Sequence, residues 1–120
     1  MAGQEVRFTV SFTIPEENLK HFKAIAQAMI ASTQAETGTL GYDWFYSPDG
    51  SRCRLIETYV DSNAVLTHMT GHAVRELVPK IVHYAQITGF EVYGDPGIEA
   101  GTILAGLGAE VFAFDAGLSR

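Results

Sequence analysis

The sequence has few of the features that mark secreted, nucleic-acid-binding or membrane proteins. Among its 120 residues there is one cysteine, Cys53, so neither an intrachain disulfide nor a thiolate cage around a metal can form. Eight basic residues stand against 14 acidic ones, and the resulting charge of -6 would repel DNA, RNA and anionic membranes. No run approaches the ~20 apolar residues of a membrane span, and the first residues lack the basic start and apolar run of a signal peptide. We therefore expect a cytoplasmic protein without nucleic-acid or membrane partners.

Apolar residues are abundant by comparison. Hydrophobic residues make up 47% of the chain and charged residues 18%, which excludes intrinsic disorder. At this length one hydrophobic core is expected, and the apolar content is higher than a small monomer needs. The surplus suggests a buried subunit interface.

The first half of the chain predicts a strand, a helix and a hairpin. Apolar and polar residues alternate from Val6 to Ile14, which is the period of a strand. Pro15 and two glutamates then suit a helix start, and Thr37-Gly38 ends the helix. The aromatic run 42–46 leads into the turn Ser47-Pro-Asp-Gly50, and the return strand covers Cys53 to Val60. Apolar residues of the helix recur at three- and four-residue spacing: Leu19, Phe22, Ala26, Met29, Ile30 and Thr33.

The second half predicts a broken helix and a fourth strand. Three candidate N-caps, residues 61–63, precede a short helix from about Ala64, and Gly71 interrupts it. Helical spacing resumes over 73–84 with a kink or a short break at Pro79, and a strand follows over 86–93. The order β-α-β-β-α-β indicates an α+β, ferredoxin-like fold, in which helices cover one face of a four-stranded antiparallel sheet. We expect a domain over residues 1–97 and an extension or arm over 98–120, with strand character at 110–114, packed on the core or on a partner subunit.

The two faces of the predicted strands suggest a partner. If helices cover one face of the sheet, the other face of a monomer should be polar. In the third strand, however, Leu55 and Tyr59 lie on one side and Ile56 and Val60 on the other. In the second strand, Phe45 likewise lies on the side opposite to three other aromatic residues: Tyr42, Trp44 and Tyr46. A second sheet from a symmetric subunit is the simplest cover, so we predict a homodimer.

Four histidines are the first candidates for proton transfer near neutral pH. His21 and His83 lie opposite the apolar stripes of their helices, which favours surface positions. His68, His72 and Glu76 have helical spacing for a metal site, but Gly71 interrupts them and the zinc signature is absent, so no metal is expected. His68 borders the apolar side of its helix, formed by Val65, Leu66 and Met69, and is either a core or capping histidine or a catalytic one.

Glu57 is a carboxylate in a mostly apolar strand. Once buried it must be hydrogen-bonded, ion-paired or neutral, and a structural role, anchoring backbone amides of the following helix, is the favoured interpretation. Cys53 is best explained as a buried structural residue. The aromatic residues could line a pocket for a flat aromatic ligand or form an ordinary core or interface: Tyr42, Trp44, Tyr46 and Tyr59.

Motifs of hydrolases and nucleotide enzymes are absent, since neither a Gly-x-Ser-x-Gly elbow nor a phosphate-binding loop occurs. The ordered set Gly41-Tyr-Asp-Trp-Phe-Tyr46, Leu55-Ile-Glu-Thr-Tyr-Val-Asp-Ser62, Ala64 and His68 instead resembles the antibiotic biosynthesis monooxygenase domain. The resemblance covers roughly residues 4–95. With the closing segment 88–94 and the tail through Gly108, the chain is similar to quinol monooxygenase-like members of that family.

The resemblance implies a dimeric α/β barrel and oxidation of quinols or polyketide-derived phenols by O2 without metal or flavin. It assigns His68 as proton acceptor and Glu57 as the group that orients His68 or the helix start. It also assigns pocket walls or donors to Tyr42, Trp44 and Tyr59, with Leu66 and Met69 beside them. The haem-degrading branch is disfavoured because the first strand has no asparagine and the single tryptophan lies on the second. The alternatives are a non-catalytic dimer that binds a small aromatic ligand, and a fold whose cavity is filled by its own side chains.

Overall fold

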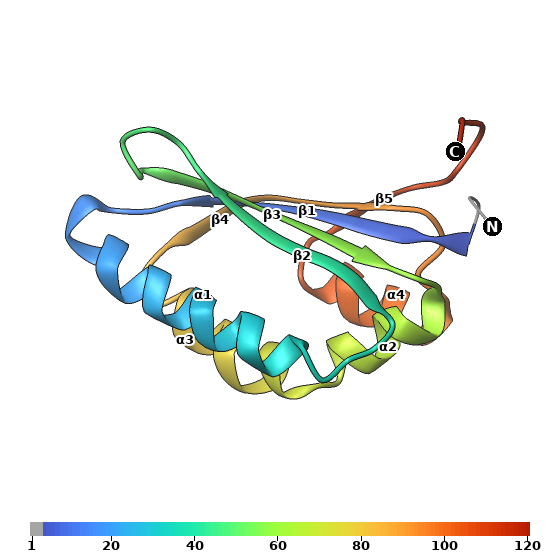
Figure 1. Ribbon diagram of the computed structural model, residues 1–120, viewed down its shortest axis with the longest axis horizontal. Coiled ribbons are helices and arrows are strands. Elements are labelled where there is room, and N and C mark those ends of the chain that lie inside the picture. Colours follow the sequence, from blue (N-terminus) through green and yellow to red (C-terminus); the bar gives the residue numbers. More distant parts are fainter. Residues whose placement is uncertain (1–3) are drawn as a thin grey trace.

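A computed structural model describes residues 4–120. Residues 1–3 lie outside the described part, and they include the start of the predicted domain and of the segment considered for a targeting signal. Helices cover one face of a five-stranded sheet (Figure 1). The elements are β1 (Val6–Thr13), η2 (Glu16–Asn18), α1 (Leu19–Thr33), β2 (Thr39–Tyr46), β3 (Arg52–Tyr59), α2 (Ser62–Met69), η3 (Ala73–Leu77), α3 (Val78–Ile81), β4 (Gln86–Tyr93), α4 (Ile98–Gly106) and β5 (Glu110–Phe112).

The strand order β2-β3-β1-β4-β5 confirms the ferredoxin-like fold. The first four strands pair antiparallel, and β5 adds a short parallel edge beside β4. At the centre of the sheet Val10 pairs with Leu55 on one side and Phe90 on the other. This register brings the inward residues of β1, β3 and β4 into line under the helices.

Alternation in β1 and β3 sorts their side chains as the sequence predicts. Val6, Phe8, Val10 and Phe12 face the helices and are almost fully buried. In β3 the inward side chains include Glu57 as well as apolar neighbours, and all are buried. The helix α1 buries Phe22, Ala26 and Met29 against this face, so the core is one layer between sheet and helices.

The connection after α2 is a π-helix followed by a short α-helix, where the sequence predicts a helix with a kink or a short break at Pro79. In the π-helix η3 the amide of Val78 donates to the carbonyl of Ala73, five residues back. Pro79 has no amide hydrogen, and it lies in the first turn of α3, where a proline costs no helical hydrogen bond. The wider turn of η3 is a form often found at functional sites.

The helix α4 is absent from the sequence prediction, which expects an arm over this segment. Its residues Ala100 and Leu104 are buried in a cluster with Phe8 and Met69. A stretch rich in glycine and alanine lacks the clear apolar stripe by which a helix is predicted from sequence. The helix α4 is stabilised by its tertiary packing. The strand β5 ends at Phe112, two residues before the predicted end, and residues 113–120 are exposed.

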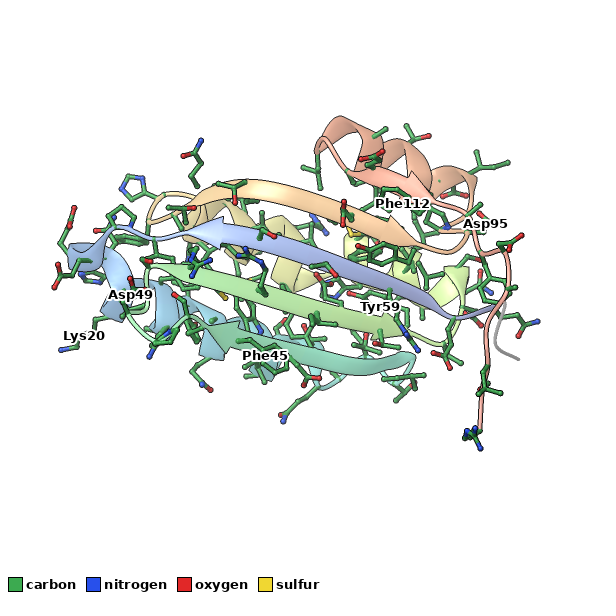
Figure 2. All side chains as sticks on the ribbon, turned by 90° about the horizontal axis from the view of Figure 1, so that it is seen from above. Lys20, Phe45, Asp49, Tyr59, Asp95 and Phe112 are labelled. Carbon is green, nitrogen blue, oxygen red and sulfur yellow. The ribbon has the colours of Figure 1, made fainter. Side chains whose placement is uncertain are left out.

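The sheet face away from the helices is uncovered in the single chain, and Figure 2 looks onto it. Large apolar side chains on the strands are exposed there, among them Phe45 at 54%, Ile56 at 39% and Tyr93 at 38%. Over residues 4–120, no helix is both long and apolar enough to cross a membrane.

Candidate functional site

A cavity of about 390 Å³ lies between the inner face of the sheet and the helices. A volume of this size falls within the range of ligand pockets, which is about 300–1,000 Å³. Apolar side chains form most of its wall, and its polar lining groups are Tyr42, Glu57 and His68. The apolar residues of the wall are Phe8, Val10, Phe12, Met29, Leu55, Met69, Val74, Val78, Pro79, Ile81, Val82, Ile87, Phe90 and Leu107.

Three different elements supply the polar groups. Tyr42 comes from β2, Glu57 from β3 and His68 from the last turn of α2. The Nε2 atom of His68 lies 3.5 Å from Oε1 of Glu57, and its ring centroid lies 5.4 Å from that of Tyr42. Glu57 and His68 are 4% and 2% exposed, so this end of the cavity is shielded from bulk solvent.

Tyr59 lies directly beside this group. Its hydroxyl donates a hydrogen bond to Oε1 of Glu57, and its ring packs 5.4 Å from that of His68. Figure 2 labels Tyr59 on β3, two residues after Glu57 and on the same side of the strand. Tyr59 is fully buried and is absent from the cavity wall, so it contacts the site through Glu57 and His68.

A further acidic residue, Glu36, was missed by the sequence analysis. Its Oε1 lies 2.8 Å from Nδ1 of His68, and Thr39 donates a hydroxyl hydrogen bond to the same oxygen at 3.4 Å. Glu36 lies in the turn after α1, where a charged residue normally indicates a solvated loop. The signal that could have found it is Gly38, since a Cβ there would lie 2.6 Å from the Cβ of Ala64. That glycine lets the turn approach α2 and brings Glu36 to His68.

Burial dominates the electrostatics of the site. It raises the pKa of Glu57, while His68 and the Tyr59 hydrogen bond lower that pKa and Glu36 raises it. Burial also raises the pKa of Tyr59 and of Tyr42, and the nearby Glu57 carboxyl adds to both shifts. The two phenols therefore keep their protons at neutral pH, and that of Tyr59 donates to Glu57.

The geometry defines which nitrogen of His68 is available for chemistry. With a carboxylate of Glu36 at Nδ1, the neutral ring carries its proton on that atom and leaves the Nε2 lone pair on the side of Glu57. In such a pair the base, His68, can accept one proton, and the carboxyl with a raised pKa, Glu57, can supply another. The site is therefore equipped for general acid–base chemistry.

The structure separates the sequence candidates into two groups. Tyr42, Glu57, His68 and Met69 line the cavity. Trp44 instead stacks on Phe12 and lines a separate hollow of about 600 Å³ between α1 and β2, together with Lys23, Gln27 and other residues. Leu66 lies at a small outer hollow beside α4.

The structural role favoured for Glu57 at sequence level belongs to another residue. The N-cap of α2 is Asp61, whose Oδ1 accepts a hydrogen bond from the amide of Ala64 at 2.9 Å. Glu57 contacts the side chains of Tyr59 and His68. A carboxylate on the inner face of β3 points toward the cavity, whereas the cap must lie at the helix end.

The remaining histidines are exposed. His72 contacts the hydroxyl of Ser32 at 3.1 Å, and His21 stacks on Tyr84. Within residues 4–120, no group of three or more His, Cys, Asp or Glu side chains could hold a metal ion. His68, His72 and Glu76 are therefore not assembled into a metal site. Cys53 is fully buried, and burial raises the pKa of its thiol to about 11.

The family comparison covers the stretch that carries these polar residues. The sequence model of the family described as "Antibiotic biosynthesis monooxygenase" matches residues 6–80, which include Glu36, Tyr42, Glu57 and His68. The chain belongs to the antibiotic biosynthesis monooxygenase family. No curated protein matches the sequence closely enough to count as a relative.

Solved structures place this family member beside proteins of the same fold. MupZ from Pseudomonas fluorescens is 28% identical, with a TM-score of 0.85 over 98% of this chain and 95% of that one. Rv0793 from Mycobacterium tuberculosis is 22% identical, with a TM-score of 0.68 over 78% of this chain and 97% of that one. A structure described as an antibiotic biosynthesis monooxygenase is 22% identical, with a TM-score of 0.64 over 72% and 92%. The last two matches support the fold alone. In both, a larger share of the other chain than of this chain is covered.

Proposed function

We propose that this family member is a cofactor-independent monooxygenase that oxidises a small quinol or other phenolic, polyketide-like compound with O2. The observation that carries the proposal is the position of His68, a buried base at the polar end of an otherwise apolar cavity. A phenol has an acidic O–H group on an apolar ring, and these two parts match the two ends of the cavity. Membership of the monooxygenase family supports the same reaction class.

In the proposed reaction Nε2 of His68 accepts the proton of the substrate hydroxyl. The resulting anion is electron-rich and transfers electrons to O2, so the substrate is its own reductant. One oxygen atom forms a bond to a ring carbon, and the other leaves as water with two hydrogens of the substrate. A hydroquinone thus becomes a hydroxyquinone, and four electrons pass to O2. The proton that His68 accepted is one of the two hydrogens that leave in the water, so His68 is ready for another cycle. Tyr42 and Glu57 would bind and orient the oxygen of the substrate, and the apolar wall would exclude water.

The proposal includes a homodimer. The exposed apolar residues Phe45, Ile56 and Tyr93 lie on the sheet face without helices, and a second sheet packed against it would remove them from water. The family resemblance, a dimeric α/β barrel, supports the same arrangement. A cytoplasmic location remains a prediction from the sequence.

The test is oxygen consumption by metal-free protein over a panel of hydroquinones, naphthoquinols and anthrones. Denatured protein corrects for autoxidation. We expect saturable uptake that His68→Ala lowers by about 10²-fold or more, the range of general-base contributions. The matched control is His21→Ala, since His21 is an exposed histidine of α1 and neither it nor its chain neighbours line the cavity. Uptake unchanged in His68→Ala would remove His68 as the base, and no uptake over the panel would count against the monooxygenase.

A second candidate function uses the same cavity without oxygen. The buried Glu57, whose raised pKa favours the protonated form, lies next to His68, and such an acid and base together suit a redox-neutral proton transfer. Exchange of ligand hydrogens in D2O, followed by NMR in the absence of O2, tests this function. Binding without exchange or oxygen uptake would instead favour the non-catalytic module for a small aromatic ligand.

A further inference from the structure

The cavity has an exposed apolar rim as well as a buried polar end. Val82, Ile87 and Leu107 line the cavity, yet they are 42%, 36% and 48% exposed. They come from the residue after α3, from β4 and from the end of α4. We call these three residues the rim. Large apolar side chains gathered at the opening of a pocket cost free energy in water unless a ligand covers them.

The cavity is also larger than a single ring requires. A cavity of about 150 Å³ is enough for benzene, so a ring at the polar end leaves more than half of the 390 Å³ unfilled. The unfilled part is bounded by apolar side chains, because Tyr42, Glu57 and His68 are the polar lining groups. What fills it must therefore be hydrocarbon.

Charge limits the ligand further. The wall contains no lysine or arginine, and it contains the carboxyl of Glu57, with Glu36 behind His68. An anionic group that enters from solvent would meet no lysine or arginine in the wall and would lie near these carboxyls, which is costly in a buried site. The anion of the proposed reaction differs, because it forms inside the cavity beside the His68 that has taken its proton. The part of the ligand within the cavity is therefore uncharged.

We infer that the substrate is an elongated, uncharged amphiphile, which inserts a hydroxyl-bearing head toward Glu57 and His68 and lays an apolar extension across the rim. This inference rests on the proposed function for the identity of the head as a phenol. All rim residues lie beyond residues 6–80, the stretch that the family model matches, whereas the polar end lies within it. In this inference the rim is the part of the site that accommodates the longer ligand.

The test is the binding of a series of 4-alkylphenols with lengthening chains, measured by titration calorimetry under nitrogen. Burial of one methylene corresponds to about 0.8 kcal/mol, or about fourfold in affinity. We expect Kd to fall about threefold to fourfold per methylene until the chain passes the rim, and then to level off. The 4-alkylbenzoate of equal length should bind at least tenfold more weakly.

A pair of leucine variants locates the extension. Leu107→Ser should weaken octylphenol binding about threefold to tenfold and leave the affinity for ethylphenol unchanged. Leu118→Ser is the matched control, because Leu118 is 77% exposed and lies away from the cavity wall. Equal effects of the two variants, or a Kd independent of chain length, would overturn the inference.

Binding separates this inference from the proposed function. A chain-length dependence in a protein that consumes no oxygen would leave the rim assignment standing and remove the monooxygenase. Oxygen uptake with equal affinity for short and long phenols would remove the rim assignment and leave the monooxygenase standing.

Discussion

Oε1 of Glu36 lies 2.8 Å from Nδ1 of His68, which ties the turn before β2 to the last turn of α2. The two side chains are 12% and 3% exposed, so the contact is largely withdrawn from water. A hydrogen bond to a charged carboxylate in such surroundings is stronger than one between neutral groups. It holds the ring of His68 in one tautomer and one orientation toward the cavity.

Replacement of Glu36 by glutamine should weaken this contact. The amide keeps an acceptor of similar shape but loses the negative charge, and we expect the free energy of unfolding to fall by about 1–2 kcal/mol, the difference between a charge-assisted and a neutral hydrogen bond. Urea denaturation at pH 7 measures the change, and the downfield N–H proton resonance of His68 should shift or disappear. Glu110→Gln, which makes the same change at an exposed position of β5, is the control and should leave both readouts unchanged.

Protonation of Glu57 should couple to stability. Burial raises its folded pKa above the unfolded one, so the folded chain holds the proton more tightly. The stabilisation is fully present below the unfolded pKa, near 4.3, declines as the pH rises beyond it, and is lost once the pH passes the folded pKa. Glu57→Gln lacks this dependence, so its stability relative to the native protein should increase as the pH rises above about 4.5. Denaturation across pH 4–8 checks the sign, and a parallel pH profile in the two proteins would contradict it. Glu110→Gln, at an exposed position, should follow the native profile.

The thiol of Cys53 should be inert in the folded protein. It is fully buried and its pKa is about 11, so almost no thiolate is present at neutral pH and none is accessible. A chromogenic disulfide reagent at pH 8 should label the thiol on the timescale of unfolding, and at once in denaturant. Labelling within seconds in native buffer would be the contrary result.

Gly38 should be intolerant of a side chain. Because a Cβ there would lie 2.6 Å from that of Ala64, Gly38→Ala must push the turn away from α2 and draw Glu36 away from His68. We expect a loss of about 1–3 kcal/mol in unfolding free energy, typical of overpacking. The control is Gly106→Ala in α4, where the added Cβ meets nothing within 4 Å, and its stability should be unchanged or slightly raised. Equal stabilities of the two variants would show that the turn relaxes freely.

The uncovered sheet face should mediate self-association. Ile56→Lys puts a charge in the middle of this face and should convert a dimer at micromolar concentration into a monomer, as measured by light scattering. Ile98→Lys makes the same chemical change at a residue that is 91% exposed on α4, and it should leave the dimer intact. A native protein that scatters as a monomer would disprove the dimer directly.

Local patterns in the sequence determined much of the fold. The alternation in β1 and β3 is a property of neighbouring residues, and so is the three- and four-residue spacing in α1, so both could be assigned without tertiary information. The β4 strand over 86–93 was predicted with the same bounds. The buried position of His68 followed less directly, from its place beside an apolar stripe.

The tertiary structure alone decided the rest of the site. Glu36 and His68 are 32 residues apart, and only the close approach at Gly38 brings them together. Trp44 is an aromatic residue of the kind that lines ligand pockets, but in the structure it stacks on Phe12 and lines the separate hollow between α1 and β2. The helix α4 carries no strong helical signal of its own and forms because Ala100 and Leu104 are buried against the core. Patterns of period two or three to four residues report which face a side chain occupies, whereas contacts between distant segments depend on how closely their backbones can pack.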